Sequence, residues 1–206
     1  TTIFQDGNRI LKFGDDVSTG KLSIRELKQD GSIRWKKAGH ATGSVSFLMS
    51  DKVRLEIGGK ESINMEVLQY FGPSDLYSLS LYGEALRDDR IVHLAGLTDL
   101  REFRVTARKI SPIGLSVLSK FENLRILSLR GCRVNKSVIE HVVTLRYLEN
   151  LDLRDTKITD STVAHLVKLG GLKMLKLDET TITNVSLLLL AHDLPECDVL
   201  PARIGK

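Results

Sequence analysis

Cationic side chains recur at a fixed interval in the second half of this chain. Arg130 and Arg154 are separated by one such interval, and Arg104 and Lys176 share another column of the same period. Arginine recognises carboxylates and phosphates well because its N–H donors form a planar fork. If the fold brings these residues side by side, they form a basic strip that suits an acidic or anionic partner.

Histidines also fall on this period, at His93, His141 and His165, which suggests a metal site. Zinc holds its nitrogen ligands about 2.0–2.1 Å away. Equivalent residues on stacked helices lie roughly 10 Å apart, which is the diameter of a helix. Val117 also interrupts the row. We therefore expect packed or half-exposed histidines and no metal ligands.

No set of residues for catalysis or cofactor binding stands out. The sequence contains no Walker loop and none of the H-E-x-x-H, C-x-x-C or G-x-S-x-G motifs. The segment from Gly58 to Glu61 lacks the spacing of a phosphate-binding loop and is typical of a turn. We predict no catalytic residues, no cofactor and no enzyme activity.

Apolar residues show the same period. Leu76, Leu100, Leu124, Leu148 and Leu172 follow one another at this spacing without a slip. Three further columns repeat with them: Leu79, Phe103, Leu127, Leu151 and Leu175; Leu81, Val105, Leu129, Leu153 and Leu177; and Leu86, Ile110, Val134, Ile158 and Ile182. The resulting pattern, L-x-x-L-x-L-x-x-[N/C/T]-x-[L/I], is the signature of a leucine-rich repeat, and the period lies in its range.

Each repeat changes from a strand pattern to a helix pattern. The second and third columns alternate with polar residues, as in a half-buried strand. Later residues such as Ile91, Leu94 and Leu97 stand three apart, and we interpret them as the apolar face of a return helix. The predicted fold class is α/β, a leucine-rich-repeat solenoid of about five 24-residue strand–helix units with a parallel sheet on its concave face.

Polar residues of the strands are expected on the concave face, which is the usual binding side of a solenoid. The candidate partner-binding residues are Tyr82, Arg104, Arg108, Ile126, Arg130, Arg133, Arg154, Met174 and Lys176. The apolar members of this set favour a protein partner over a phosphate backbone. The alternative is a solvated face, on which exposed ion pairs contribute about 0–1 kcal/mol each. In that case the arginines pair across repeats with Asp152, Asp155, Asp178 and Glu179.

Residues 1–70 break the period, and we predict that they form a β-rich domain. Short apolar runs at 10–13, 22–27, 32–35, 44–48 and 53–57 are separated by glycine and aspartate and predict strands. Asp30-Gly31 predicts a tight hairpin, and Trp35 is expected in or beside a core. A short helix is predicted over residues 61–71. The domain is either a cap for the open end of the solenoid or a separate docking module.

The remaining boundaries follow from the repeat. Residues 71–201 are the predicted repeat domain, and residues 202–206 are a tail. Val199 lies one period after Leu175 and predicts a final edge strand. Pro195 and Pro201 flank this strand and limit further pairing.

Composition limits the function classes. The net charge of +4 and pI of about 9.1 over 206 residues are only mildly basic, well below a dedicated nucleic-acid binder. No run of 18 apolar residues exists that could span a membrane. Cys132 occupies the [N/C/T] position and lies nearly three repeats from Cys197, beyond disulfide reach. Two reduced cysteines weakly favour a reducing compartment such as the cytoplasm.

One repeat carries a resemblance to a known family. Residues 156–166, TKITDSTVAHL, resemble the T-x-[IV]-T-D-x-x-[LV]-x-x-L of bacterial leucine-rich-repeat proteins, the short kind found in planctomycete-like genomes. They are also similar to the ribonuclease-inhibitor-like, cysteine-containing repeats of eukaryotic F-box adaptors, although no F-box is present. The ending Leu-Pro-x-Cys-x-Val from Leu194 looks like a bacterial repeat terminus. The resemblance covers about 125 residues and implies protein–protein interaction without catalytic residues.

These observations lead to one expected function and two alternatives. We expect a non-catalytic module that binds an unidentified, acidic protein through the concave face or its rim. One alternative is a scaffold or regulatory domain of a larger protein or complex. The lesser alternative is binding of nucleic acid or another anionic polymer through the arginine rim.

Overall fold

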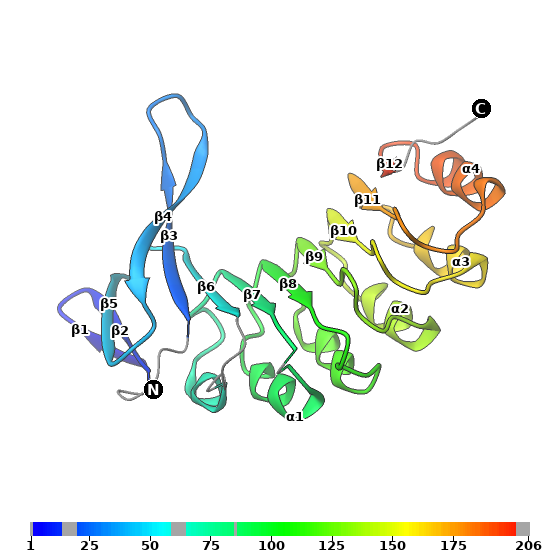
Figure 1. Ribbon diagram of the computed structural model, residues 1–206. Helices are drawn as coiled ribbons and strands as arrows, with labels where there is room; N and C mark the ends of the chain where they lie inside the picture. Colours follow the sequence, from blue (N-terminus) through cyan, green and yellow to red (C-terminus); the bar gives the residue numbers. More distant parts are fainter. Residues whose placement is uncertain (1, 14–19, 59–64, 85, 201–206) are drawn as a thin grey trace.

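A computed structural model describes residues 2–13, 20–58, 65–84 and 86–200. Seven parallel strands lie side by side in chain order, and the sheet curves along the molecule (Figure 1). They are β6 (Val53–Gly58), β7 (Ser78–Tyr82), β8 (Glu102–Thr106), β9 (Ile126–Ser128), β10 (Asn150–Asp152), β11 (Met174–Lys176) and β12 (Asp198–Leu200). Every strand pairs with the next at an offset of one repeat, as in Leu127 with Leu151 and Leu151 with Leu175. The period in the sequence is therefore the register of the sheet.

The apolar columns form the core that the repeat predicts. Phe103, Leu127 and Leu175 are fully buried, and Leu151 is 1% exposed. They join a single cluster of buried side chains that extends from the N-terminal segment to Leu194. Stacking of the repeats removes these apolar edges from water, because one repeat cannot cover its own edge. The leucine-rich-repeat architecture and the final edge strand at Val199 are confirmed.

The return segments differ from the predicted helices. Most are single α-turns or 3₁₀ turns: α1 (Asp88–Ile91) with η2 (Val92–Leu94), η3 (Gly114–Lys120), and η4 (Asp160–Thr162) with α3 (Val163–Leu166). Among the described residues, only α2 (Lys136–Val142) and α4 (Asn184–Asp193) are longer α-helices. Apolar residues stand three apart both in the 3₁₀ helix η3 and in the α-helix α2, so this spacing does not decide between the two helix types.

Polar side chains join successive repeats on the return side. The Asp88 carboxylate accepts hydrogen bonds from the backbone N–H and the hydroxyl of Ser111, at 2.8 and 2.6 Å. Asp160 accepts the same pair of bonds from Thr183, at 2.9 and 3.0 Å. A Cβ atom on Gly114 would lie 2.4 Å from Asp88 Oδ1, so a larger residue there would require the Asp88 carboxylate to shift from the first of these links.

The N-terminal segment contributes to two sheets. β1 (Thr2–Gln5), β2 (Asn8–Lys12) and β5 (Ser44–Leu48) form a three-stranded antiparallel sheet. β3 (Lys21–Leu27) and β4 (Ile33–His40) form a hairpin that extends the repeat sheet to nine strands, because β3 pairs antiparallel with β6. All five predicted strands are present. The 3₁₀ helix η1 (Glu66–Tyr70) lies in the predicted helical segment, of which residues 61–64 are outside the described part.

The sheet and the core both continue across residue 70, where the sequence predicts a domain boundary. Arg9 is 5% exposed and joins the small sheet to the first repeat. Its Nη atoms donate to the backbone carbonyls of Ser74 and Asp51 at 2.8 and 2.6 Å. Burial lowers the pKa of Arg9, and the nearby Asp75 and Asp51 oppose that shift. The predicted tail at 202–206 lies outside the described residues.

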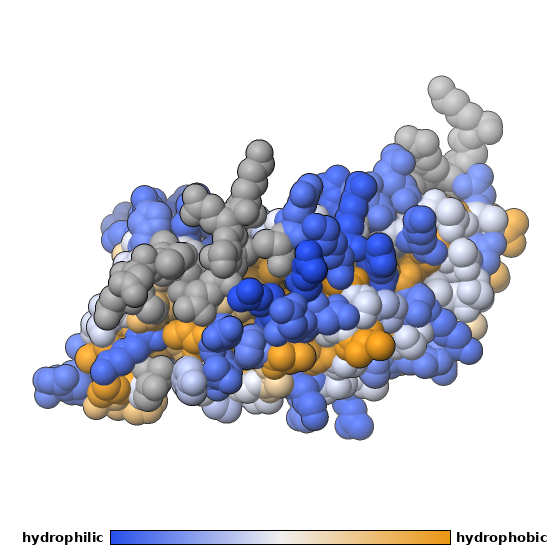
Figure 2. All heavy atoms as spheres, turned by 60° about the horizontal axis from the view of Figure 1, so that its bottom comes forward, coloured by the Kyte–Doolittle hydropathy of each residue, from blue (hydrophilic) through white to orange (hydrophobic). Residues whose placement is uncertain are grey.

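Apolar residues at the surface are mostly scattered. Seen from the side shown in Figure 2, hydrophilic residues cover most of the face, and smaller apolar areas lie between them. On α4, Val185, Leu188 and Leu189 are between 48% and 68% exposed. None of the helices in the described ranges is long and apolar enough to cross a membrane.

Candidate functional site

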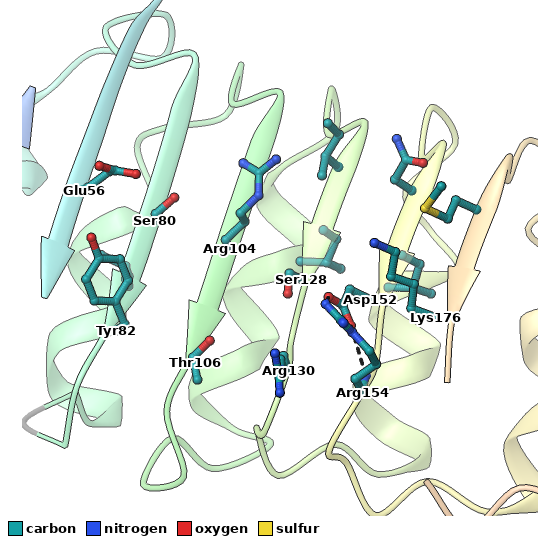
Figure 3. A pocket seen from close by; sticks show the side chains of 16 residues that line it. Glu56, Ser80, Tyr82, Arg104, Thr106, Ser128, Arg130, Asp152, Arg154 and Lys176 are labelled. Atoms are coloured by element: carbon teal, nitrogen blue, oxygen red, sulfur yellow. Dashed lines mark hydrogen bonds and ion pairs between the residues drawn. The ribbon is translucent and has the colours of Figure 1, made fainter. Parts of the chain in front are cut away.

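The concave face of the sheet holds a broad hollow of about 620 Å³ (Figure 3). Alternate residues of strands β6 to β11 line it, because successive side chains of a strand point to opposite faces. Seven predicted residues line this hollow: Tyr82, Arg104, Ile126, Arg130, Arg154, Met174 and Lys176. Arg108 and Arg133 instead line a neighbouring hollow of about 680 Å³ near the ends of the strands. The fold thus brings the predicted set to one side of the molecule.

Arg154 makes a bidentate ion pair in the hollow. Its Nε and Nη2 atoms donate to the two carboxylate oxygens of Asp152, at 2.9 and 2.7 Å. The hydrogen bonds that Arg154 donates to Asp152 raise the pKa of Arg154. Burial alone would raise the pKa of Asp152, but the bonds and charge of Arg154 outweigh burial, and this pKa lies below its usual value. Such a fork-to-fork pair is rigid, so it presents a fixed polar surface.

Arg130 pairs with the next repeat. Its Nε atom donates to Asp155 Oδ2 at 2.7 Å, and both side chains are more than one third exposed. Asp155 has φ of 57°, and the equivalent residues Gly131 and Glu179 have φ of 71° and 57°. The turn after these strands therefore needs the left-handed conformation, which costs an ordinary residue free energy and suits glycine.

A partly buried chain of charges joins the hairpin to the repeats. Arg54 Nη2 lies 3.1 Å from Glu102 Oε2, and Arg104 Nη1 lies 2.7 Å from the same oxygen. Ser78 donates its hydroxyl to that oxygen at 3.1 Å. The guanidinium of Arg54 also lies over the Trp35 ring, 3.9 Å from its centroid, which is a favourable cation–π arrangement. Trp35 is therefore a half-buried residue beside this chain.

Burial by itself would raise the pKa of Glu102. The hydrogen bonds and positive charges of Arg104 and Arg54 outweigh burial, so the pKa of Glu102 lies below its usual value. For Arg54, burial lowers the pKa and Glu102 opposes the change. Glu102 is thus held ionised between two cations, of which Arg104 lines the hollow.

Tyr82, Ile126 and Met174 give the face its apolar character. Tyr82 is 43% exposed, and the other two are half-buried. The Tyr82 ring occupies the space over Gly58, where a Cβ atom would lie 2.0 Å from the ring. Burial, and then the charge of Glu56, raise the pKa of the Tyr82 hydroxyl. These side chains offer an apolar contact area among ion pairs.

Carboxylates of the protein itself neutralise part of the positive charge on this face. Arg104, Arg130 and Arg154 all have carboxylate partners. Within the described part of the chain, Arg108 and Lys176 form no ion pair at 4.0 Å or less. The alternative prediction that the arginines pair across repeats with aspartates is confirmed for Arg130 with Asp155. It is wrong for Arg154, which pairs with Asp152 of its own repeat.

Sequence reasoning missed β6 as the first strand of this site, which contributes Glu56 to the hollow. Leu55 and Ile57 lie one period before Leu79 and Leu81, and they are the signal that β6 is a further repeat strand. The signal is weak because Lys52 stands where the first column requires leucine. As a result, the period does not place Trp35, Arg54 and Glu56 near the face.

The three histidines of the repeat position are all half-buried. In the residues that the structure describes, no group of three or more His, Cys, Asp or Glu could hold a metal ion. Cys132 and Cys197 are not bonded to each other. Cys132 donates to the backbone carbonyl of Val105 at 3.5 Å, and burial raises the pKa of its thiol to about 11.

Comparisons with known proteins identify the fold. No protein-family model matches the sequence, and no curated protein matches it. Among solved structures, an internalin (inlF) of Listeria monocytogenes is similar over 71% of this chain and 38% of its own, with 17% identity and a TM-score of 0.52. An internalin C2 of the same organism matches at 15% identity and a TM-score of 0.43, covering 71% of this chain and 69% of its own. A leucine-rich-repeat protein of Leptospira interrogans matches at 21% identity and 0.41, covering 64% and 30%.

These neighbours are bacterial leucine-rich-repeat proteins, as the resemblance implies. The likeness to inlF supports the fold alone, and the chain spans little more than a third of that protein's length. The planctomycete-like and ribonuclease-inhibitor-like subtypes remain predictions.

Proposed function

We propose that this chain is a non-catalytic module that binds a protein through the concave face of its repeats. One observation carries the proposal: Tyr82, Ile126 and Met174 line the same hollow as Arg104 and Arg154, and both of these arginines are paired with carboxylates. Mixed surfaces of this kind, with aromatic and Met side chains beside Arg, are typical of protein interfaces. The repeat sheet presents them on one rigid curved support.

The partner in this proposal has an apolar contact residue surrounded by polar groups. Because Arg104, Arg130 and Arg154 already have carboxylate partners, acidic groups of the partner would pair with the remaining cations. Those are Lys176 in the hollow and the rim residues Arg108 and Arg133. A nucleic-acid backbone fits this face less well, because it gains most of its affinity from free cations.

A scaffold role in a larger protein or complex is a second candidate. The exposed Val185, Leu188 and Leu189 on α4 favour it, because three apolar residues on one short helix suit packing against another surface. Residues 1–70 act as the cap of the solenoid in our proposal. The buried Arg9 and the continuous core support that role.

Site-specific photo-crosslinking in the native host tests the proposed face. Benzoylphenylalanine replaces Tyr82 in the hollow, and in a matched protein it replaces Tyr147, which is 57% exposed and lies outside every hollow described above. We expect a discrete protein adduct from position 82 and none from position 147. Equal adducts at both positions, or an adduct only at 147, would reject the concave face.

Charge substitution tests the same face by a different route. Met174→Arg should abolish the adduct formed at position 82, because it places a charge in the apolar contact area. Ile113→Arg is the control, since Ile113 is 82% exposed and lies outside the hollow. An adduct that survives Met174→Arg would contradict the proposed contact.

A further inference from the structure

The β3–β4 hairpin projects beyond the curve of the repeats (Figure 1). Residues 21–40 contain six Lys and Arg and two Asp and Glu, so their net charge is +4. This equals the net charge of the whole chain, and the other residues together are neutral. The positive charge of the protein is thus concentrated on one exposed hairpin. Its electrostatic attraction would favour an acidic partner.

β4 is the free edge of the nine-stranded sheet. Two hydrogen bonds reveal which of its backbone groups face outward. The N–H of Lys28 donates to the carbonyl of Ser32 at 2.8 Å, so these two residues form a hydrogen-bonded pair. The N–H of Arg25 donates to Lys52 on the other side, at 3.0 Å, so it does not point toward β4.

Hydrogen-bonded and non-hydrogen-bonded pairs alternate along antiparallel strands. The pairs of Leu27 with Ile33, Arg25 with Trp35, and Ser23 with Lys37 are therefore the non-hydrogen-bonded ones. The backbone N–H and C=O groups of Ile33, Trp35 and Lys37 then point away from β3, toward the open edge. Such a row of unpaired groups is a template for another strand.

The side chains beside this edge differ on its two faces. Ile33 is 52% exposed, and its neighbour Leu27 is 71% exposed on the same face. Trp35 follows on that face and is held by Arg54, whose guanidinium lies 3.9 Å from the ring centroid. The other face carries Arg34 and Lys36, which share the single carboxylate of Glu26 at 2.6 and 3.8 Å.

We propose that β4 accepts an extended, acidic segment of a partner protein as an additional β-strand. Strand addition of this kind takes affinity from main-chain hydrogen bonds and specificity from alternate side chains. The lysines of the edge oppose a second copy of this chain, because its own β4 would bring like charges together. The same lysines attract carboxylates, and the apolar pair offers a contact that a nucleic-acid strand would not use.

The alternation along β4 defines the partner's pattern. Positions opposite Ile33 and Trp35 suit apolar residues, and positions opposite Arg34, Lys36 and Lys37 suit glutamate. An antiparallel segment would therefore read glutamate–glutamate–valine–glutamate–valine. The proposal concerns a surface separate from the hollow, and it does not depend on the function proposed for the concave face.

A labelled peptide with this pattern, flanked by serines, is the probe. Binding to the full chain is measured by fluorescence anisotropy. We expect saturable binding that the double variant K36E/K37E weakens at least tenfold. The matched control reverses Lys120 and Lys168, which are exposed cations of the repeats; this variant should bind the peptide as the original protein does.

Backbone pairing is tested separately from charge. A peptide with the same side chains and N-methyl groups on alternate residues cannot donate the edge hydrogen bonds, so its binding should be lost. Equal binding of the two peptides would reduce the interaction to charge attraction and overturn strand addition. Absence of saturable binding, or tighter binding of duplex DNA or phosphatidylserine vesicles than of the peptide, would also overturn it. Met174→Arg alters the hollow of the concave face and should leave peptide binding to β4 unchanged. The strand-addition proposal can therefore fail or succeed independently of the function proposed for the concave face.

Discussion

Replacing Glu102 by glutamine should destabilise the fold strongly, because two cations depend on its charge. The side chains of Arg54 and Glu102 are only 16% and 11% exposed, and Arg104 binds the same carboxylate oxygen at 2.7 Å. Glutamine keeps nearly the same volume and can still accept from Ser78. It leaves Arg54 and Arg104 as neighbouring like charges without a counter-ion. Removal of one partner of a buried ion pair costs about 3–5 kcal/mol. Because Arg104 is 37% exposed, we expect the lower end, about 3 kcal/mol.

The free energy of unfolding is measured by urea denaturation at neutral pH, with Glu140→Gln as the control. Glu140 makes an exposed pair with Lys136 at 4.0 Å, one helical turn away, and its loss should cost at most about 0.5 kcal/mol. The two substitutions remove the same charge, so the comparison isolates burial.

The pH dependence provides a second readout. The folded pKa of Glu102 is below its usual value, which is about 4.3 in an unfolded chain. The stabilisation that the Glu102 carboxylate gives to the fold is therefore fully present above that unfolded pKa, and it is lost as the pH falls through the folded pKa. The difference between the original protein and Glu102→Gln should shrink only in strongly acidic solution. A cost below about 1 kcal/mol at neutral pH, or a difference that is unchanged from neutral to strongly acidic pH, would refute this account of the charge chain.

Three further predictions follow from the fold. Glu179→Gly should raise the free energy of unfolding by about 0.5–1 kcal/mol, because glycine removes the left-handed strain at φ of 57°. The control Glu196→Gly, at a residue without positive φ, should not raise it, and equal effects of the two variants in thermal unfolding would contradict the strain. Cys132 should resist alkylation by iodoacetamide until the protein unfolds, because its pKa of about 11 leaves little thiolate near neutral pH. Mass spectrometry measures the alkylation, and rapid alkylation of the folded chain would show that the thiol is not buried. Leu151→Ala should lower the free energy of unfolding by about 2–5 kcal/mol, measured by urea denaturation. Leu188 is half-exposed on α4, so Leu188→Ala should lower it by well under half as much. Similar losses for the two variants would argue against a continuous core.

The repeats are predictable because the signal is local and periodic. The column of Leu79, Phe103 and Leu127 specifies both the strand and its register, since each residue pairs with the one that lies one period later. Alternation within each strand then assigns Arg104 and Met174 to the concave face. A residue of the candidate site is therefore predictable wherever its position in the repeat determines the face of the sheet to which its side chain points.

The remainder depends on contacts that the period does not encode. Trp35 reaches Arg54 through a hairpin that runs antiparallel to the repeats, and no spacing in the sequence indicates this contact. The first strand of the parallel series, β6, is not recognised from the repeat pattern, because the charged Lys52 occupies the position at which the pattern requires leucine. The return segments differ from expectation for another reason: the same three-residue apolar spacing occurs in α-helical and in 3₁₀ segments, so the spacing cannot tell the two apart.

The fixed offset between neighbouring strands has a consequence for how such a chain can change. Removal or duplication of any stretch equal in length to one repeat leaves every remaining ladder in phase, since the next strand arrives with its leucines on the same side. The length of the curved face can thus vary in whole steps while its ends stay as they are. An insertion of any other length must instead be absorbed as a bulge or loop.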